Sequence, residues 1–420
     1  MLGPSTLPGM VTTRGRIALA AGAGARWASR VTGRGAGAMI GGLVAMTLDR
    51  TILRQLGEGR RSALVTGTNG KSTTTRMLAA ALQTVAPVAT NAEGANMDAG
   101  LVSALAVARD APLAALEVDE MHVPHVADAL DPAVIVLLNL SRDQLDRVGE
   151  INHIERTLRA GLARHPDTVI VANCDDVLIT SAAYDSPNVV WVAAGAGWAN
   201  DSVSCPRSGE VIVRDGSHWY STGTDFKRPT PQWSYDATHI HGPDGLTLPM
   251  RLKLPGEVNR GNAAQAVAAA VALGADPAAA VAAVESVEEV AGRYRTLRHG
   301  RHTVRILLAK NPAGWQEALS MVDTAAGSVV IAVNGRVPDG EDLSWLWDVN
   351  FEHFVNHPVV AAGERGTDLA VRLGYAGVQH TLVHDTVKAI ESCPPGHVEV
   401  VANYTAFLEL NRALERSGRG

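Results

Sequence analysis

The sequence predicts an α/β fold divided into more than one domain. Short apolar runs alternate with stretches of helical spacing, as in "PLAALEVDE" from residue 112, "AVIVLLNL" from 133 and "TVIVANCDD" from 168. Strands that alternate with helices are typical of parallel sheets. The aromatic content of only 4% suits helices packed closely on such a sheet. At 420 residues the chain exceeds one ordinary core, so we expect two or three domains.

The stretch "ALVTGTNGKSTTTRML" at 63–78 predicts the end of a buried strand, a glycine loop and a helix. Such a loop directs backbone N–H groups and the helix dipole toward one point, where Lys71 adds a charge and the Ser72 hydroxyl can bind Mg2+. We therefore predict a nucleotide polyphosphate site; the plainer alternative is a glycine turn followed by an exposed lysine. The predicted contacts are Gly67, Thr68, Asn69, Gly70, Lys71, Ser72 and Thr73.

Charged residues follow the next strands at their carboxyl ends, where ligands of parallel sheets gather. Glu117 ends one strand, residues 139–146 follow the next, and Asp175-Asp176 follow the third. A carboxylate facing the loop suits Mg2+, so we expect Glu117 to bind the metal with Ser72. The alternative for Glu117 is a surface acid paired with a nearby base. Asp119 and Glu120 are expected in solvent or behind the metal ligand.

Composition changes mark the domain boundaries. Residues 1–50 are predicted as a basic N-terminal arm, and 51–295 as a nucleotide-binding domain. Short polar pieces at about 200–250 predict small inserted hairpins. A second α/β block is expected at 296–420, with strands "TVRILLA", "SVVIAVN", "HPVVAAG" and "HVEVVAN".

The net charge and the cysteine content indicate the class of protein and its cellular compartment. A net charge of −6 argues against a nucleic-acid binder, and three dispersed cysteines favour a reducing compartment. No stretch approaches the roughly 20 apolar residues that span a bilayer, so we expect a cytoplasmic protein. The first 48 residues carry five arginines and no acidic residue. They are interpreted either as a segment that leans on an anionic membrane or substrate, or as a solvated arm.

Four stretches together resemble the Mur ligases, ATP-dependent enzymes that couple amines to carboxylates in peptidoglycan precursors. They are GTNGKS at 67–72, LEVDE around Glu117, NLSRDQLDR at 139–147 and NRGNAAQA at 259–266. "ILLAKNPAGWQEAL" at 306–319 and "NGRVPDGEDLSWLWDVNFE" at 334–352 resemble the MurT group, synthetase subunits that work with the glutaminase GatD. The resemblance implies a central P-loop ATPase domain with a small inserted β subdomain, and a C-terminal α/β domain.

The resemblance also assigns nucleotide contacts outside the loop. Asn259 and Asn262 lie three residues apart on one helix face and are implied to contact adenine, whereas the alternative for Asn259 is helix N-capping. Arg293 resembles an arginine near the family's nucleotide, with an interdomain salt bridge as the alternative.

A C-terminal aspartate is implied to approach the Cys-His dyad of the glutaminase and orient its histidine. Asp348 is the first candidate and Asp342 the second; the alternative is a loop whose tryptophans fill the local core. Lys310 and Asn311 are expected to face the acyl phosphate or the incoming ammonia.

The sequence departs from the family at several positions. Only about 50 residues precede the first strand, where relatives have a domain for a UDP-sugar, so a lipid-linked substrate fits better. Gln144 and Val148 replace two histidines, and an apolar position near Leu158 replaces the lysine that bridges a second Mg2+ in many relatives. Cys205 is the only cysteine of the insert, so we expect the shape of the group's zinc ribbon without zinc. His122 and His125 lack further metal ligands.

We therefore expect ATP- and Mg2+-dependent amidation of the D-glutamate α-carboxylate in the lipid II stem peptide. Ammonia from a GatD-like glutaminase would displace phosphate from an acyl phosphate and give D-isoglutamine. No basic partner for Cys174 is evident, so the chain is not expected to release ammonia from glutamine itself. The alternatives are an amino-acid-adding ligase of the Mur or folylpolyglutamate type, and a nucleotide-gated scaffold for a glutaminase.

Overall fold

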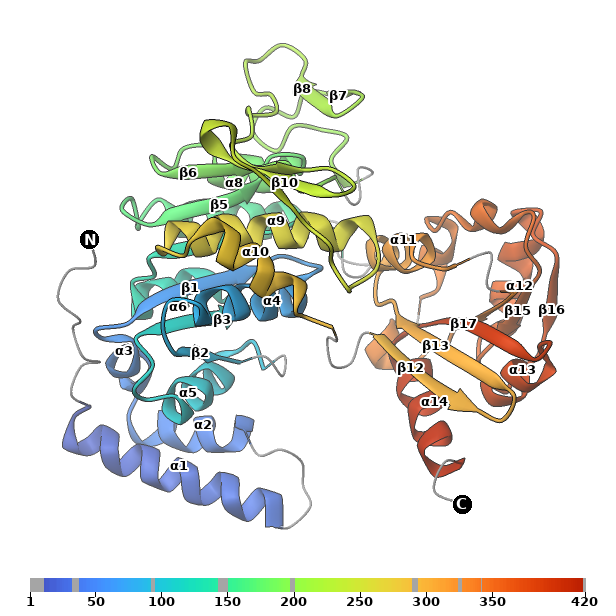
Figure 1. The fold of residues 1–420 in the computed structure, drawn as a ribbon, viewed down its shortest axis with the longest axis horizontal. Helices are drawn as coiled ribbons and strands as arrows, with labels where there is room; N and C mark the ends of the chain where they lie inside the picture. Colours follow the sequence, from blue (N-terminus) through green and yellow to red (C-terminus); the bar gives the residue numbers. More distant parts are fainter. Residues whose placement is uncertain are drawn as a thin grey trace. The chain divides into compact units, whose positions relative to one another are not determined.

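The computed structural model describes residues 11–31, 38–91, 95–142, 150–196, 201–288, 294–323, 327–340 and 342–417. The chain forms two compact units (Figure 1). The first comprises Met1–Leu140 and Gly149–Glu288, and the second comprises Ser141–Val148 and Glu289–Gly420. Arg293 and the segment 143–149 lie outside the described residues.

The first unit contains a six-stranded parallel sheet in the order β2-β3-β1-β4-β5-β6. Its strands are β1 Arg61–Thr66, β2 Val88–Thr90, β3 Leu113–Glu117, β4 Val134–Leu137, β5 Val169–Asn173 and β6 Val189–Val192. The predicted parallel α/β sheet is thus confirmed. Because β1 pairs with both β3 and β4, the loop after β1 lies where the strand order reverses, which is the usual ligand position in such sheets.

Helices cover this sheet and bury its apolar strands. Figure 1 shows α4, α9 and α10 together over it, and these three helices pack against one another. The helices are α3 Ile52–Gly57, α4 Lys71–Gln83, α5 Asp98–Val107, α6 Val123–Leu130, α7 Glu150–Leu162, α8 Val177–Ala183, α9 Glu257–Ala272 and α10 Pro277–Glu285.

The segment predicted as a basic arm contains two packed helices, α1 Thr13–Val31 and α2 Ala38–Leu48. They cross at Gly22 and Gly41, where a Cβ added to Gly22 would lie 2.5 Å from the Gly41 carbonyl oxygen. Helix α2 packs in turn on α5. The arginines left open a segment on an anionic surface or a solvated arm, and neither interpretation anticipated the small residues whose close contact holds this helical hairpin.

The insert contains the predicted hairpins. Strands β7 Ile212–Asp215 and β8 His218–Ser221 form one; β9 Ser234–Tyr235, β10 His239–His241 and β11 Thr247–Pro249 form an antiparallel sheet. Cys205 packs with Trp219, Phe226 and two aliphatic residues in a small apolar cluster. Cys205 is therefore part of the packed core of the insert. Burial raises the pKa of its thiol, but hydrogen bonds, those from Ser208 and Ser221 among them, outweigh this effect and lower the pKa.

The second unit is a six-stranded sheet in the order β12-β13-β17-β14-β15-β16, with only the β12–β13 pair antiparallel. Its strands are β12 Tyr294–His299, β13 His302–Leu308, β14 Gly327–Ala332, β15 Val359–Ala362, β16 His380–Leu382 and β17 Gly396–Ala402. Its helices are α11 Pro312–Ser320, α12 Gly366–Tyr375, α13 Thr386–Ser392 and α14 Tyr404–Ser417. The predicted C-terminal α/β block is confirmed.

Candidate functional site

The loop between β1 and α4 takes a shape that requires glycine. Gly67 has φ 140° and Gly70 has φ 85°, conformations that L side chains rarely adopt. A Cβ at Gly67 would lie 2.9 Å from the Asn139 backbone nitrogen. The remaining predicted loop residues follow in order, and Lys71, Ser72 and Thr73 form the first turn of α4. The loop therefore leads directly into the N-terminus of α4, and anion binding at this helix end stays a prediction.

Lys71 is held inside this loop by oxygen acceptors. Its Nζ donates to the Gly67 carbonyl at 2.5 Å and lies 3.2 Å from Glu120 Oε1. Glu120 is 8% exposed, so of its two expected positions the one in solvent is wrong, and the one behind the metal ligand stays a prediction. The lysine charge compensates the carboxylate that leaves water. The exposed lysine of a plain glycine turn is also excluded, because only 12% of the Lys71 side chain is exposed.

Glu117 ends β3 with one carboxylate oxygen available to a ligand. The side-chain amide of Asn91 donates to the Glu117 carbonyl and accepts from its N–H, both at 2.8 Å. Asn96 Nδ2 lies 3.4 Å from Glu117 Oε1. Among the described residues, the buried Oε2 has no hydrogen-bond partner. A buried unpartnered carboxylate oxygen fits a hard divalent cation, so this residue suits Mg2+.

Asn139, the second residue after β4, clamps the loop from the other side. Its carbonyl accepts from Thr68 N–H at 2.9 Å, and its side-chain Oδ1 accepts from Asn69 N–H at 2.9 Å. Its Nδ2 donates to the Asn69 carbonyl at 3.0 Å. Sequence reasoning gave no role to Asn139, Asn91 or Asn96. For Asn139, its position just after a strand that pairs with β1 was the available signal.

Asn259 and Asn262 are both buried in α9. The Asn262 amide lies against Gly70, where an added Cβ would approach its Oδ1 to 2.9 Å. Asn259 Nδ2 donates to the Pro255 carbonyl at 2.5 Å, and Gly256 occupies the N-cap. The N-capping alternative for Asn259 is therefore wrong, because the helix begins two residues earlier, at Glu257. The pair lies beside the nucleotide loop, and its adenine contact stays a prediction.

The other polar groups near the strand ends have structural partners. Asp175 pairs with Arg228 at 2.6 Å, and Asp176 caps α8 through the N–H groups of Leu178 and Ile179. Burial raises the pKa of Asp176 to about 6. Burial likewise raises the pKa of the Cys174 thiol to about 12, which keeps it protonated and unsuited to nucleophilic attack.

His122 and His125 share Asp98 as their acidic neighbour. His125 Nε2 lies 3.1 Å from Asp98 Oδ2, and His122 Nδ1 lies 3.7 Å from Oδ1. In the described part of the chain, no group of three histidine, cysteine or acidic residues is arranged to hold a metal. Both imidazole rings thus lie beside the carboxylate of one aspartate.

The two candidate aspartates of the second unit differ in environment. Asp342 is exposed, and the hydrogen bond from Ser344 N–H at 2.8 Å holds its pKa below the usual value. Asp348 is half-buried, with Oδ2 4.0 Å from Nη2 of Arg142, which belongs to the same unit. Near them Trp345 stacks on Trp315 in the core, with ring centroids 5.3 Å apart.

Trp347 is 55% exposed, in contrast to Trp345. The alternative in which both tryptophans fill the core is therefore only half right. Lys310 Nζ lies 5.3 Å from the centre of the Tyr404 ring. Asn311 caps α11 by accepting from Gly314 N–H at 2.8 Å, which gives this buried side chain a structural role.

Two family models match the chain. The Mur ligase middle domain covers residues 65–270, and the MurT ligase C-terminal domain covers 308–407. The chain belongs to the Mur ligase family. The family assignment predicted from the sequence motifs is confirmed.

Similar Mur ligase sequences include two curated MurT subunits of lipid II isoglutaminyl synthase (glutamine-hydrolysing). The one from Streptococcus pneumoniae is 28% identical over 416 residues, covering 90% of this chain and 93% of the relative. The one from Staphylococcus aureus strain COL is 29% identical over 427 residues, covering 94% and 97%. The similarity therefore extends over both units.

Solved structures share the Mur ligase fold. Pseudomurein peptide ligase type C from Methanothermus fervidus matches with a TM-score of 0.66 at 17% identity, over 85% of this chain and 79% of that one. MurF from Thermotoga maritima, solved in complex with ADP, matches with a TM-score of 0.59 at 16% identity, over 88% and 83%. At these identities the likeness establishes the fold, which confirms the predicted α/β architecture.

Proposed function

We propose that this chain is the synthetase subunit of a lipid II isoglutaminyl synthase. It amidates the D-glutamate α-carboxylate of the lipid II stem peptide to D-isoglutamine at the expense of ATP. The observation that carries the proposal is the similarity to MurT subunits over 90% and 94% of the chain, including the match to the MurT C-terminal model. The buried lysine and glutamate around a glycine loop supply a matching nucleotide site.

The loop residues have roles that follow from their chemistry. Lys71 neutralises the charge of the β- and γ-phosphates, and the backbone N–H groups at the N-terminus of α4 orient them. Glu117 Oε2 and the Ser72 hydroxyl are the proposed Mg2+ ligands. Bound ATP would supply the phosphoryl group that activates the substrate carboxylate, and Mg2+ would neutralise phosphate charge. Asn262 fixes the loop behind Gly70 and, with Asn259, is proposed to meet adenine.

The nitrogen is proposed to come from a separate glutaminase subunit. The buried Cys174 is protonated, so it does not serve as a glutaminase nucleophile. The MurT relatives are named as subunits, which fits a two-subunit enzyme. Asp348 is the first candidate to orient the histidine of a GatD-like partner, and Asp342 is the second. Lys310 is the candidate to face the incoming ammonia.

The proposed substrate is attached to a lipid, which places the reaction at the cytoplasmic face of the membrane. None of the described helices combines the length and the apolar character that crossing a bilayer requires. The proposed enzyme therefore meets lipid II as a peripheral protein, without a spanning segment among those helices.

Isotope transfer tests the proposal. The chain and its candidate glutaminase are co-expressed and incubated with lipid II, ATP, Mg2+ and glutamine labelled with heavy nitrogen in its amide. Mass spectrometry should find the label at the D-glutamate α-position, and Lys71→Ala should abolish it. Absence of label from both glutamine and ammonium, with ATP bound but not consumed, would contradict the proposal and favour a scaffold. Ligation of a free amino acid without a partner would favour an amino-acid-adding ligase.

A further inference from the structure

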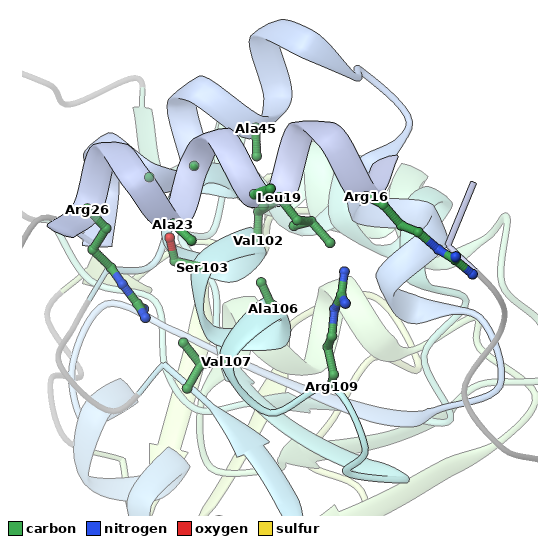
Figure 2. Close-up of a pocket in the computed structure, with 13 residues that line it drawn as sticks. Arg16, Leu19, Ala23, Arg26, Ala45, Val102, Ser103, Ala106, Val107 and Arg109 are labelled. Atoms are coloured by element: carbon green, nitrogen blue, oxygen red, sulfur yellow. The ribbon is translucent and has the colours of Figure 1, made fainter. Parts of the chain in front are cut away.

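A pocket of about 390 Å³ lies between α1, α2 and the end of α5 (Figure 2). Its lining is mostly aliphatic. Small side chains on α1 and α2 leave this space open against α5, beside the contact of Gly22 with Gly41. The aliphatic residues that the argument uses are Leu19, Ala23, Ala45, Val102 and Ala106.

Three arginines surround this apolar lining. Arg16 and Arg26 come from α1, and Arg109 follows α5; Figure 2 shows Arg26 and Arg109 extending into the space between the two helices. Within the described part of the chain, none of the three guanidinium groups makes a hydrogen bond or an ion pair with another residue. Like charges gathered without a carboxylate repel one another, so the cluster favours an anionic ligand.

The surrounding sequence adds no compensating charge. The first 48 residues contain no acidic residue. Thr51 N–H and the side-chain amide of Gln55 donate hydrogen bonds to the carboxylate of the next acid, Asp49. Asp110 interacts electrostatically with the buried Arg60. The positive potential of the pocket is therefore not neutralised by its own helices.

Several apolar side chains of the same helices are exposed. Ile17, Trp27 and Val31 of α1 are 63%, 68% and 66% exposed, and Ile40 and Leu43 of α2 are also exposed. With 100° between successive helical residues, Trp27 and Val31 fall beside the row that lines the pocket. Exposed apolar side chains beside arginines, as at Trp27 and Val31, are typical of a segment that binds an amphiphile.

We propose that α1 and α2 dock on a membrane surface and that the pocket receives the phosphate of an anionic phospholipid. The arginines take the phosphate, while the exposed aliphatic side chains and Trp27 enter the boundary between headgroups and acyl chains. The exposed apolar row distinguishes this occupant from a soluble anion, for which it would serve no purpose. The inference goes beyond the proposed amidation and uses neither its nucleotide site nor its partner.

Vesicle co-sedimentation of the full chain, without ATP or lipid II, tests this inference separately from the reaction. The chain should bind vesicles of phosphatidylcholine mixed with phosphatidylglycerol and should leave them as salt is raised. Each of Arg16→Ala, Arg26→Ala and Arg109→Ala should weaken binding about fivefold, and the triple variant about a hundredfold. Arg156→Ala, which removes an exposed arginine of α7, is the matched control and should bind like the wild type.

Two further variants separate charge from folding. The triple Arg→Lys variant should retain most of the binding, and Trp27→Ala should weaken it while all three arginines remain. Equal binding to vesicles of pure phosphatidylcholine, or wild-type binding by the folded triple Ala variant, would overturn the inference. So would arginine-dependent binding to phosphatidylcholine vesicles containing a polyprenyl diphosphate but not to those containing phosphatidylglycerol, because the pocket would then serve the substrate lipid.

Discussion

The Lys71 ammonium group has hydrogen-bond acceptors within the protein itself. The Gly67 and Thr68 carbonyls and a carboxylate oxygen of Glu120 share its ammonium group. Bound phosphates would compete with Glu120 for this charge, so the ion pair opposes nucleotide binding. The buried Glu120 carboxylate thus neutralises the lysine charge and, by doing so, weakens the attraction of Lys71 for phosphate.

Glu120→Gln should therefore tighten the binding of a non-hydrolysable ATP analogue by about threefold to tenfold, measured by calorimetry without Mg2+. Asp119→Asn is the control, because this neighbouring carboxylate accepts from Met121 N–H at 3.1 Å and the substitution should leave affinity unchanged. Weaker binding by the Glu120 variant would show that the carboxylate supports the bound nucleotide instead of competing with it.

Glu117→Gln should lower the ATP turnover rate by about a hundredfold and shift its dependence to higher Mg2+ concentration, because a neutral amide is a poorer ligand for a hard cation. The strand end should keep its position, since Asn91 holds the Glu117 backbone and not its side chain. Turnover measured over a series of Mg2+ concentrations checks this. Unchanged Mg2+ dependence would remove Glu117 from the metal site.

The site was only partly predictable at this scale. The loop motif identified Lys71 directly, because its residue types and spacing carry the chemistry. The Asn139 clamp depends on which strands become neighbours of β1, and the pairing of Glu120 depends on the turn after β3. Such contacts arise from the fold and leave little trace in local sequence.

At the scale of elements, two variants at the N-terminus of α11 distinguish a structural role of Asn311 from a chemical one. Asn311→Ala should destabilise the second unit by about 1 kcal/mol through loss of the cap, whereas Asn311→Asp keeps the oxygen that accepts from Gly314 N–H. Urea unfolding measures stability, and ammonium-dependent amidation measures function. If Asn311→Asp is stable but inactive, the amide itself faces the reaction; full activity would confine Asn311 to capping.

The cap of α8 gives a pH-dependent contribution to stability. The folded pKa of Asp176, about 6, lies above its ordinary value of 3.8, so the folded protein holds an extra proton between these values. This stabilisation is full below about pH 4 and is lost as pH rises through about 6. Relative to Asp176→Asn, the wild type should lose at most about 3 kcal/mol over this range in urea unfolding. A pH-independent difference would contradict the raised pKa.

Helices and strands with strong apolar periodicity were predictable from the sequence, whereas a polar strand at the edge of a sheet was not. The apolar runs around 113–117, 134–137 and 169–173 form β3, β4 and β5 as expected. The antiparallel edge strand β12, Tyr294–His299, was not anticipated, because its arginine-rich sequence lacks an apolar run. Helices α1 and α2 were also missed, because glycine and alanine spacing indicates close packing only once the partner helix is known.

At the scale of the whole molecule, a variant at Asp348 tests how glutamine hydrolysis by the proposed partner is coupled to amidation by this chain. Asp348→Asn should reduce glutamine-dependent amidation by about a hundredfold or more, while amidation from ammonium stays near the wild-type rate, since only the histidine of the partner loses its orienting charge. Asp342→Asn is the matched comparison. Equal loss with both nitrogen sources would place Asp348 in the synthetase chemistry instead, and loss only with Asp342→Asn would exchange the two assignments.

The nucleotide loop also depends on residues made much later during translation. Asn262 fills the space behind Gly70, and Gln265 Nε2 donates to the Leu137 carbonyl at 2.9 Å across 128 positions of sequence. A ribosome-bound chain can form the strand and helix around Lys71 early, but the loop acquires its final support only after α9 has left the exit tunnel. The nascent chain should therefore bind nucleotide only after α9 has been synthesised. Fragments that end before α9 should not retain ATP.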